Sequence, residues 1–381
     1  MKKIRLYLTI FVFLLLLNCI NSVGFQLKNI SDEEDILNVK VWTKTFGGKS
    51  RDGCFSVQQT SDGGYILTGY YSEYGSGDFD LWLVKIDSNG NKLWDKVFGG
   101  EDWDYASDVK QTKDGGYIIT GKTRMYRYPE DVWLIKTDEN GNKEWDKAFD
   151  KGTYEYAFSV AQTNDGGYIL TGNIFSWGYP VAHIASWLIK TDENGNKIWE
   201  KIYGGDGDCS GKCVIQTQDL GYAFIGSTTF YGAGIRDFWL VKTDENGNEL
   251  WNKTYGGEKY DVGDYIQQTT DGGFIIVGET RSFGSGYFDF YLIKTDQNGN
   301  EEWSKTYGGC KFDQGWVVRQ TSDGGYIFCG HTCSYGDGSD DMWIVKTDEN
   351  GNIDDGNFEP DKPVTPIGPY QCIVGSDCSP S

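Results

Sequence analysis

A pattern of about fifty residues occurs six times along this chain of 381 residues. Each copy contains an Asp-Gly-Gly turn before an aromatic residue, and the fourth copy has Leu220 in place of the first glycine. The turns begin at Asp62, Asp114, Asp165, Asp219, Asp271 and Asp323, so successive copies are 51 to 54 residues apart. A repeat of this period indicates a chain built from one supersecondary unit used six times.

Each copy predicts four short antiparallel strands. In the first copy these strands cover residues 54–60, 65–70, 80–86 and 92–98. The Asp-Gly-Gly turn joins the first two, and an Asp-x-Asn-Gly-Asn segment joins the last two. We interpret its Asn-Gly pair as a hairpin turn in which both residues have positive φ. Four strands in one such repeat are typical of a propeller blade, so the six copies predict an all-β, six-bladed β-propeller.

The two ends of the repeat predict how the ring closes. Residues 41–46 carry the pattern of a fourth strand with no first three strands before it, and the last copy has no fourth strand. We therefore expect the N-terminal segment to pair with the last blade as its outer strand. This pairing would close a propeller that spans residues 40–355 and leave no open edge between the first and last blades.

The segments on either side of the propeller indicate export. Residues 1–24 combine basic residues, an apolar run and a short polar stretch, which is the pattern of a signal peptide. The apolar run is short for a bilayer span, so we expect no transmembrane segment after its removal. A lipid anchor on Cys19 is an alternative to simple cleavage. Residues 25–39 form an N-terminal lead and the Pro-rich residues 356–381 a tail, in a secreted or cell-surface protein.

Eight cysteines remain once the predicted signal peptide is removed, and an even number in an exported chain favours disulfides. The candidate pairs are Cys209 with Cys213, Cys329 with Cys333, Cys54 with Cys310, and Cys372 with Cys378. None of them forms a Cys-x-x-Cys motif, and the chain has only two histidines. We therefore predict no zinc site and no other cofactor, with calcium the one cation left open.

The repeat resembles two groups of propeller proteins. Its Gln-Thr-x-Asp-Gly-Gly-Tyr-Ile run is similar to the SBBP-type repeats of secreted bacterial and archaeal proteins. Its Lys-Thr-Asp-x-Asn-Gly-Asn-x-x-Trp run is similar to a segment of quinoprotein-like propellers. The resemblance covers nearly all of residues 40–352 and implies a β-propeller outside the cytoplasm. It implies no activity, because the catalytic aspartate and calcium site of quinoprotein enzymes do not map onto this chain.

Aromatic residues are frequent in two kinds of loop, between the second and third strands of a copy and between one copy and the next. Copies two and three deviate most from the repeat, so we predict ligand-binding residues there: Trp103, Tyr105, Arg124, Tyr126, Arg127, Tyr128, Tyr154, Trp177 and Tyr179. Flat rings beside polar groups are typical of sugar or peptide recognition, so the expected ligand is carbohydrate or protein. The other interpretation is that the rings pack between neighbouring blades.

Acidic residues recur at two positions of the repeat. One set lies in the loops that lead from one copy into the first strand of the next: Asp52, Asp104, Glu155, Asp261 and Asp313, with Cys209 at this position in copy four. These acids either form a ring that holds a cation or an amine-bearing ligand, or cap loops in solvent. The second set begins the third strand: Asp80, Asp131, Asp237, Asp289 and Asp341. We expect it to accept backbone N–H bonds from the preceding loop.

The sequence favours a binding or adhesion module. Its formal charge of −21 disfavours nucleic acid and anionic membranes as partners. We predict no catalytic residue, since neither His183 nor His331 has an identifiable Ser or Cys partner. Two alternatives remain open. One is an extracytoplasmic hydrolase or lyase that acts on polysaccharide through a pair of carboxyl groups, and the other is a structural surface protein with no ligand pocket.

Overall fold

The computed structural model describes residues 43–48, 50–72, 79–124, 130–176, 183–336 and 340–353. The chain divides into residues 1–43 and residues 44–381, and every strand described lies in the second unit. In these ranges the regular structure is β-strand throughout, and they contain no helix with the length and apolarity needed to cross a membrane.

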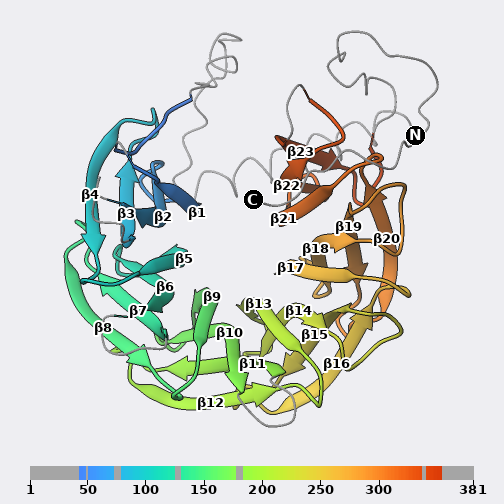
Figure 1. Ribbon diagram of the computed structural model, residues 1–381, viewed down its shortest axis with the longest axis horizontal. Helices are drawn as coiled ribbons and strands as arrows, with labels where there is room; N and C mark the ends of the chain where they lie inside the picture. The colour runs from blue at the N-terminus through green and yellow to red at the C-terminus, as the bar shows by residue number, and fades with distance from the viewer. Residues whose placement is uncertain are drawn as a thin grey trace, which may run out of the picture. The chain divides into compact units, whose positions relative to one another are not determined.

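The strands form six antiparallel sheets that follow one another in chain order, each one blade of a six-bladed β-propeller (Figure 1). Blades 1 to 3 consist of β1 (Gly53–Gln59), β2 (Tyr65–Tyr71), β3 (Asp80–Ile86), β4 (Lys92–Phe98); β5 (Tyr105–Gln111), β6 (Tyr117–Thr123), β7 (Asp131–Thr137), β8 (Lys143–Phe149); and β9 (Glu155–Gln162), β10 (Tyr168–Ser176), β11 (His183–Thr191), β12 (Lys197–Tyr203). Blades 4 to 6 consist of β13 (Cys209–Gln216), β14 (Tyr222–Thr228), β15 (Asp237–Thr243), β16 (Glu249–Tyr255); β17 (Asp261–Gln268), β18 (Phe274–Thr280), β19 (Asp289–Thr295), β20 (Glu301–Tyr307); and β21 (Asp313–Gln320), β22 (Tyr326–Thr332), β23 (Asp341–Thr347).

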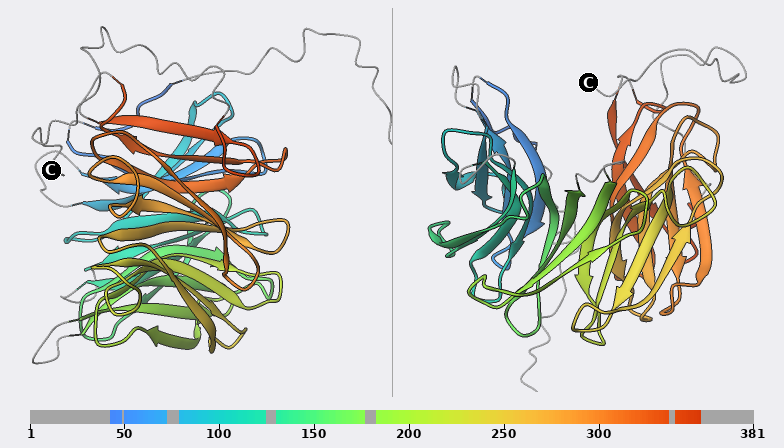
Figure 2. Two further views of the ribbon diagram at one scale, coloured as in Figure 1. Left: turned by 90° about the vertical axis from the view of Figure 1, so that its right-hand side faces the viewer. Right: turned by 60° about the horizontal axis from the view of Figure 1, so that its bottom comes forward.

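Within a blade the chain moves outward. The first strand lies nearest the centre and the fourth lies at the rim (Figure 1), and the sheets are strongly twisted when seen from the side (Figure 2). The predicted strands of the first copy agree with β1 to β4 to within one residue at each end. The all-β, six-bladed architecture expected from the repeat is therefore confirmed.

The turn between the third and fourth strands differs from the prediction. Gly90 has a φ of 76°, whereas Asn89 is not in the left-handed region. Asp87 Oδ1 accepts hydrogen bonds from the backbone N–H groups of Asn89 and Asn91, both at 2.8 Å. The aspartate thus caps a five-residue loop in which glycine alone needs positive φ, so the two-residue hairpin turn predicted from Asn-Gly is wrong. The Asp-x-Asn-Gly-Asn segment is a turn, as expected, built around its own carboxylate.

The hydrophobic cores lie between neighbouring blades. One core combines Ile66 and Leu83 of blade 1 with Val109 and Ile119 of blade 2, and all four side chains are completely buried. The middle strands are covered on both faces; every residue of β7, β15 and β19 is buried. Burial on both faces explains why these strands read as continuous apolar runs and not as an alternating pattern.

A buried lysine on the third strand satisfies the Asp-Gly-Gly turn. Lys85 is 4% exposed, donates to Thr60 Oγ1 (3.0 Å) and to the carbonyl oxygen of Ile86 (3.2 Å), and pairs with Asp62 (2.9 Å). The same pair recurs as Lys136–Asp114, Lys190–Asp165, Lys242–Asp219, Lys294–Asp271 and Lys346–Asp323. A buried ammonium needs such partners, so the repeated aspartate has a structural role.

The last blade has three strands in the structure. Residues 43–48 belong to no strand, and residues 41 and 42 lie outside the described residues. The predicted pairing of residues 41–46 with blade 6 is therefore not observed in the part of the chain that the structure describes.

The two end blades nevertheless expose faces that are buried in all other blades. Val57 of blade 1 is 60% exposed, while its counterparts are at most 2% exposed: Val109, Val160, Val214, Ile266 and Val318. Ile344 of blade 6 is 58% exposed, while its counterparts are fully buried: Leu83, Leu134, Leu188, Leu240 and Leu292. These two faces have the composition of a blade interface, as ring closure requires.

None of the predicted disulfides joins two of the six described cysteines. Cys209 and Cys213 lie four residues apart along β13 and contribute to different cores. Four residues of extended chain span about 13 Å, far beyond the Cα separation of a disulfide. Cys329 and Cys333 are separated in the same way, and no strand pairing joins the blades of Cys54 and Cys310. Cys372 and Cys378 lie outside the described residues.

Ring closure can be tested at Ile344. If blades 1 and 6 pack together, Ile344→Asp places a charge in an apolar interface and lowers the free energy of unfolding by about 3 kcal/mol. Ile198→Asp is the matched control, because Ile198 is 57% exposed on the outer strand β12, and it should cost less than about 0.5 kcal/mol. Urea unfolding measures both. Equal, small effects would show that the ring is open.

Leu220 offers a test of the repeat's turn chemistry. It is the one non-glycine residue with positive φ (69°) in the described ranges, at the position where the other copies have glycine. Because a side chain in the left-handed region is strained, Leu220→Gly should raise the free energy of unfolding by about 0.5–1 kcal/mol. Leu250→Gly, in strand β16, is the control and should be destabilising. A loss of stability with Leu220→Gly would show that the backbone at Leu220 is not strained.

Candidate ligand-binding site

The six copies differ at one position that lies in equivalent places of every blade. It follows a glycine near the end of the second strand and is occupied by Tyr70, Lys122, Asn173, Ser227, Glu279 and His331. The glycine itself is required by close packing: a Cβ on Gly121 would lie 1.8 Å from the carbonyl oxygen of Tyr105. The glycine is needed for close packing between the first and second strands. The residue after it differs in charge, polarity and size from blade to blade.

In blade 2 this variable residue, Lys122, lies against aromatic rings. Its Nζ is 5.0 Å from the ring centre of Tyr105 on β5 and 4.6 Å from that of Tyr156 on β9. The guanidinium of Arg124 lies 5.2 Å from the ring centre of Trp103. Two cations and three rings from two neighbouring blades thus form one group, within the range of cation–π attraction.

Glu130 holds the two cations together. Its side chain is almost completely buried, and Oε1 accepts two hydrogen bonds from Arg124, at 3.0 and 2.6 Å, and lies 3.5 Å from Lys122 Nζ. Tyr156 donates its hydroxyl to Glu130 Oε2 at 3.0 Å. Burial alone would raise the pKa of Glu130, but Lys122, Tyr156 and Arg124 outweigh it and lower the pKa. Glu130 is therefore ionised at neutral pH.

We call Trp103, Tyr105, Lys122, Arg124, Glu130 and Tyr156 the blade 2–3 cluster. It continues through aromatic contacts on both sides: Phe79 lies 5.9 Å from Trp103 and 5.5 Å from Tyr105, and Phe175 lies 5.6 Å from Tyr156 between ring centres. Trp103 is 39% exposed. The cluster therefore combines a solvent-accessible indole with a hydrogen-bonded charge network beneath it.

The structure brings part of the predicted ligand-binding set together. Trp103, Tyr105 and Arg124 lie in the cluster, and Tyr154 contacts it through Phe175, at 6.5 Å between ring centres. The other predicted members lie outside the described residues: Tyr126, Arg127, Tyr128, Trp177 and Tyr179. Sequence reasoning missed Lys122 and Glu130, and it counted Tyr156 among the loop aromatics without including it in the predicted ligand-binding set. The signal was available for Lys122, because aligning the six copies shows a cation where the other five have different side chains.

The acids that begin the first strands are loop caps, and four of them are fully buried: Asp104, Glu155, Asp261 and Asp313. Asp313, for example, accepts from the N–H of Gly309 (2.9 Å) and the hydroxyl of Ser334 (2.6 Å), and so joins the loop before it to the loop after β22. Asp52 accepts from the N–H of Gly48 (2.6 Å). These acids therefore cap loops, and the expectation that the caps are solvated is wrong for the four buried acids, whereas Asp52 is half-buried.

The acids that begin the third strands also cap loops, as predicted. Asp237 accepts from the N–H of Gly234 (3.0 Å), and Asp289 accepts from the N–H of Ser285 (2.7 Å). Four of these acids lie beside the first-strand acid of the next blade: Asp80, Asp131, Asp237 and Asp289. Burial raises the pKa of Asp289 to about 6, and the nearby charge of Asp313 adds to the shift. The two acidic sets therefore meet in pairs at the blade junctions.

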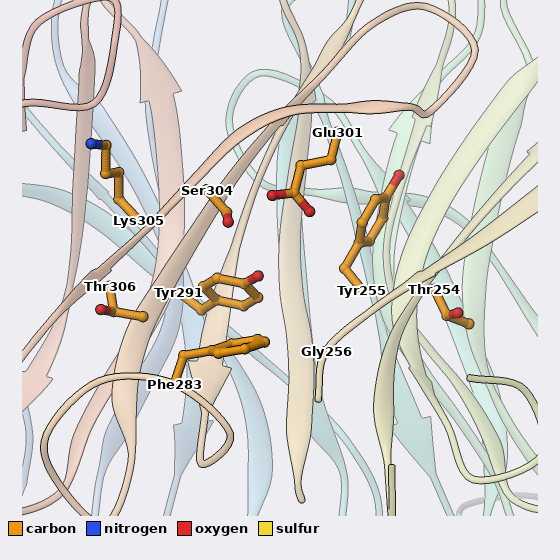
Figure 3. Close-up of a pocket in the computed structure, with 9 residues that line it drawn as sticks. All are labelled: Thr254, Tyr255, Gly256, Phe283, Tyr291, Glu301, Ser304, Lys305 and Thr306. Carbon is orange, nitrogen blue, oxygen red and sulfur yellow. The ribbon is translucent and has the colours of Figure 1, made fainter. Parts of the chain in front are cut away.

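A pocket of about 490 Å³ opens at the rim between blades 4 and 5 (Figure 3). Its lining includes the rings of Tyr291 and Phe283, whose centres are 5.3 Å apart and whose planes are tilted by 43°, with Ser304 and Glu301 beside them. In blades 1 to 4 a tryptophan donates its indole N–H to a fourth-strand side chain in the equivalent place: Trp82 to Asp95, Trp133 to Asp146, Trp187 to Glu200 and Trp239 to Asn252. The smaller Tyr291 and Ser304 replace this pair in blade 5, which opens the space.

Two further groups of titratable residues are present. Burial, with the charge of Asp264 adding to it, raises the pKa of Glu279 to about 8.

On blade 6, Asp340 Oδ1 lies 3.0 Å from Cys333 Sγ and 3.8 Å from His331 Nε2, close enough for the three to share a metal ion. The Cys333 thiol already donates a hydrogen bond to the Asp340 carboxylate, so these two groups are paired without a metal ion.

Comparisons with known proteins show likeness of fold alone. No family model and no curated protein matches the chain. Among solved structures, Sqt1 from Chaetomium thermophilum has 12% identity and a TM-score of 0.42, over 73% of this chain and 68% of that one. A putative exo-beta-1,3-galactanase from Bifidobacterium bifidum s17 has 12% identity and a TM-score of 0.39, over 67% and 92%. The eukaryotic initiation factor has 10% identity and a TM-score of 0.35, over 67% and 56%. Similarities this low say nothing about the ligand.

Opposite pKa shifts predict an acidic optimum of stability. Burial raises the pKa of Glu279 to about 8 and of Asp289 to about 6, so the folded state keeps protons that the unfolded chain loses, and stability falls as pH rises above about 4. Hydrogen bonds from Thr60 and Lys85 lower the pKa of Asp62 to about 2, so stability also falls as pH drops below about 4. Thermal unfolding should therefore give the highest Tm near pH 4–5.

The variant Glu279→Gln tests the predicted loss of stability between acidic and neutral pH. It removes a group that titrates between about pH 4.5 and 8, so the fall in Tm from pH 5 to pH 8 should become smaller. Glu301→Gln, at an exposed position, should leave the fall unchanged. An undiminished fall in Glu279→Gln would show that Glu279 titrates normally.

Proposed function

We propose that this propeller is an exported recognition module that binds carbohydrate through the blade 2–3 cluster. The observation that carries the proposal is the position of Lys122 and Arg124 against Tyr105, Tyr156 and Trp103. An indole face stacks on the apolar face of a sugar, while guanidinium, ammonium and carboxylate groups bond to its hydroxyls. The charges are held in place by Glu130, so little ordering is needed on binding.

The location of the cluster within the repeat supports the same proposal. Blade 5 has a similar arrangement, with Arg281 at 5.9 Å from the ring centre of Tyr260. It has Glu279 and Phe288 where blade 2 has Lys122 and Glu130. The complete set of rings, cations and carboxylate occurs in blade 2 and not in blade 5, which favours a single ligand site over six equivalent ones.

Binding is tested with a glycan array and soluble oligosaccharides, using the chain from residue 25 onward. Trp103→Ala should weaken carbohydrate binding about tenfold or more, because it removes the exposed stacking surface. Tyr260→Ala is the matched control: Tyr260 is also 39% exposed and holds the same position in blade 5, and its loss should leave binding unchanged.

Four outcomes would overturn the proposal. Equal loss with Tyr260→Ala would place the ligand elsewhere. Loss with the double variant Tyr291→Trp, Ser304→Asp, which restores the larger pair and fills the rim pocket, would assign binding to that pocket. Cleavage of the sugar would make the protein a hydrolase or lyase. If no carbohydrate binds, a protein ligand or a purely structural role replaces the proposal.

A further inference from the structure

The blade junctions share one arrangement of two acids around a glycine. At the junction of blades 5 and 6, a Cβ on Gly308 would lie 1.8 Å from Asp289 Oδ1 and 2.9 Å from Asp313 Oδ2. The same geometry surrounds Gly99, with Asp80 and Asp104, and Gly256, with Asp237 and Asp261. The missing side chain leaves the space in which the two carboxylates meet.

Two junctions differ from this arrangement. One of them has lost both acids, and the other has gained a third acid. Between blades 3 and 4, Ala185 and Cys209 replace both acids around Gly204. The acids are therefore lost as a pair, which indicates that they act as a unit. Between blades 2 and 3 both acids are kept, as Asp131 and Glu155, and the glycine is replaced by Asp150.

Three carboxylates consequently converge at the junction of blades 2 and 3. One oxygen from each of Asp131, Asp150 and Glu155 lies within 4.8 Å of the others. Asp131 and Glu155 are buried, while Asp150 is exposed. Lys151, next to this group in the sequence, pairs with Glu200 on β12. Three negative charges at this separation repel one another unless a cation or protons lie between them.

The buried carboxylate of Glu155 has spare binding capacity. Its side chain is fully buried, and Oε1 accepts from the N–H of Thr153 (3.0 Å) and from the hydroxyl of Thr153 (2.6 Å). Its Oε2 is buried and has no hydrogen-bond partner in the described part of the chain. A buried oxygen of this kind is costly unless a ligand binds it.

We propose that Asp131, Asp150 and Glu155 bind one Ca²⁺ ion at this junction. Calcium takes six to eight oxygen ligands in a flexible geometry, and three carboxylates supply up to six oxygens, with water as the remainder. Mg²⁺ fits less well, because it demands near-octahedral geometry and gives up water reluctantly. The exposed Asp150 leaves an entry path from solvent.

The ion would hold the main chain on which half of the blade 2–3 cluster is built. Asp131 follows Glu130 and Glu155 precedes Tyr156 in the sequence, and the N–H of Glu155 donates to the carbonyl oxygen of Glu130 at 3.0 Å. Calcium binding does not depend on the carbohydrate proposal, and the two are tested separately because the calcium measurement uses no sugar.

The test uses the chain from residue 25 after treatment with EDTA and dialysis, with CaCl₂ alone as the probe. At a hundredfold excess of Ca²⁺ over its dissociation constant, the Tm should rise by about 5 °C, and titration calorimetry should give one site. Asp150→Gly should abolish both signals. This variant installs the residue that other junctions have at this position, so it should fold, with a Tm in EDTA at or above that of the parent.

Asp206→Gly is the matched control, since Asp206 is an exposed acid in the loop at the next junction, and it should keep the full calcium response. The proposal is overturned if the parent shows no shift, or if Asp150→Gly responds as the parent does. An equal response to MgCl₂ would contradict the assignment to calcium. If the Tm rises on acidification but does not change when CaCl₂ is added, shared protons and not a metal ion relieve the repulsion among the three carboxylates.

Discussion

The burial of each blade's two faces against its neighbours is the interaction on which the rest of the structure depends. A single four-stranded sheet has no core of its own here: Ile66 and Leu83 are covered by Val109 and Ile119 of the next blade. The effect of a missing neighbour is visible at Val57 and Ile344, whose counterparts in other blades are buried. Because every interface is built by the same positions, one blade sequence can be used six times.

Polar contacts at the junctions complete this packing, so residues outside these contacts are not needed for the fold and can serve a function. The lysine of each third strand pairs with the aspartate of the turn after the first strand, and it is buried in every blade except the last, where Lys346 is exposed. The paired acids tie consecutive loops together. Once these contacts are met, residues that do not take part in them are free to vary between copies. Lys122 and Glu130 are such departures, while Asp150 replaces the glycine of the junction itself, and all three lie at the junction of blades 2 and 3.

Much of the fold could be predicted because period and turn chemistry are local properties. The predicted strands of the first copy agree with the structure to within one residue, and the structural role of Asp237 and Asp289 follows from their position after a loop, at the start of a strand. The turn at Asn89 and Gly90 was misjudged because the carboxylate of Asp87, four residues before the loop ends, competes with the backbone pattern of a two-residue hairpin. The predicted pairing of Cys209 with Cys213 is wrong because residues four apart in the sequence lie too far apart along an extended strand.

The sequence by itself determined the number of blades, the strands within each one, and which copies depart from the common pattern, since these follow from repetition and short-range chemistry. Tertiary structure alone decided which departures meet. Glu130 and Tyr156 come from different blades, as do Asp131 and Glu155, and their contacts exist because the inter-blade cores set the position of one sheet against the next. Side chains some twenty-five residues apart are brought within a few ångströms by that packing, and no local pattern in the chain records it.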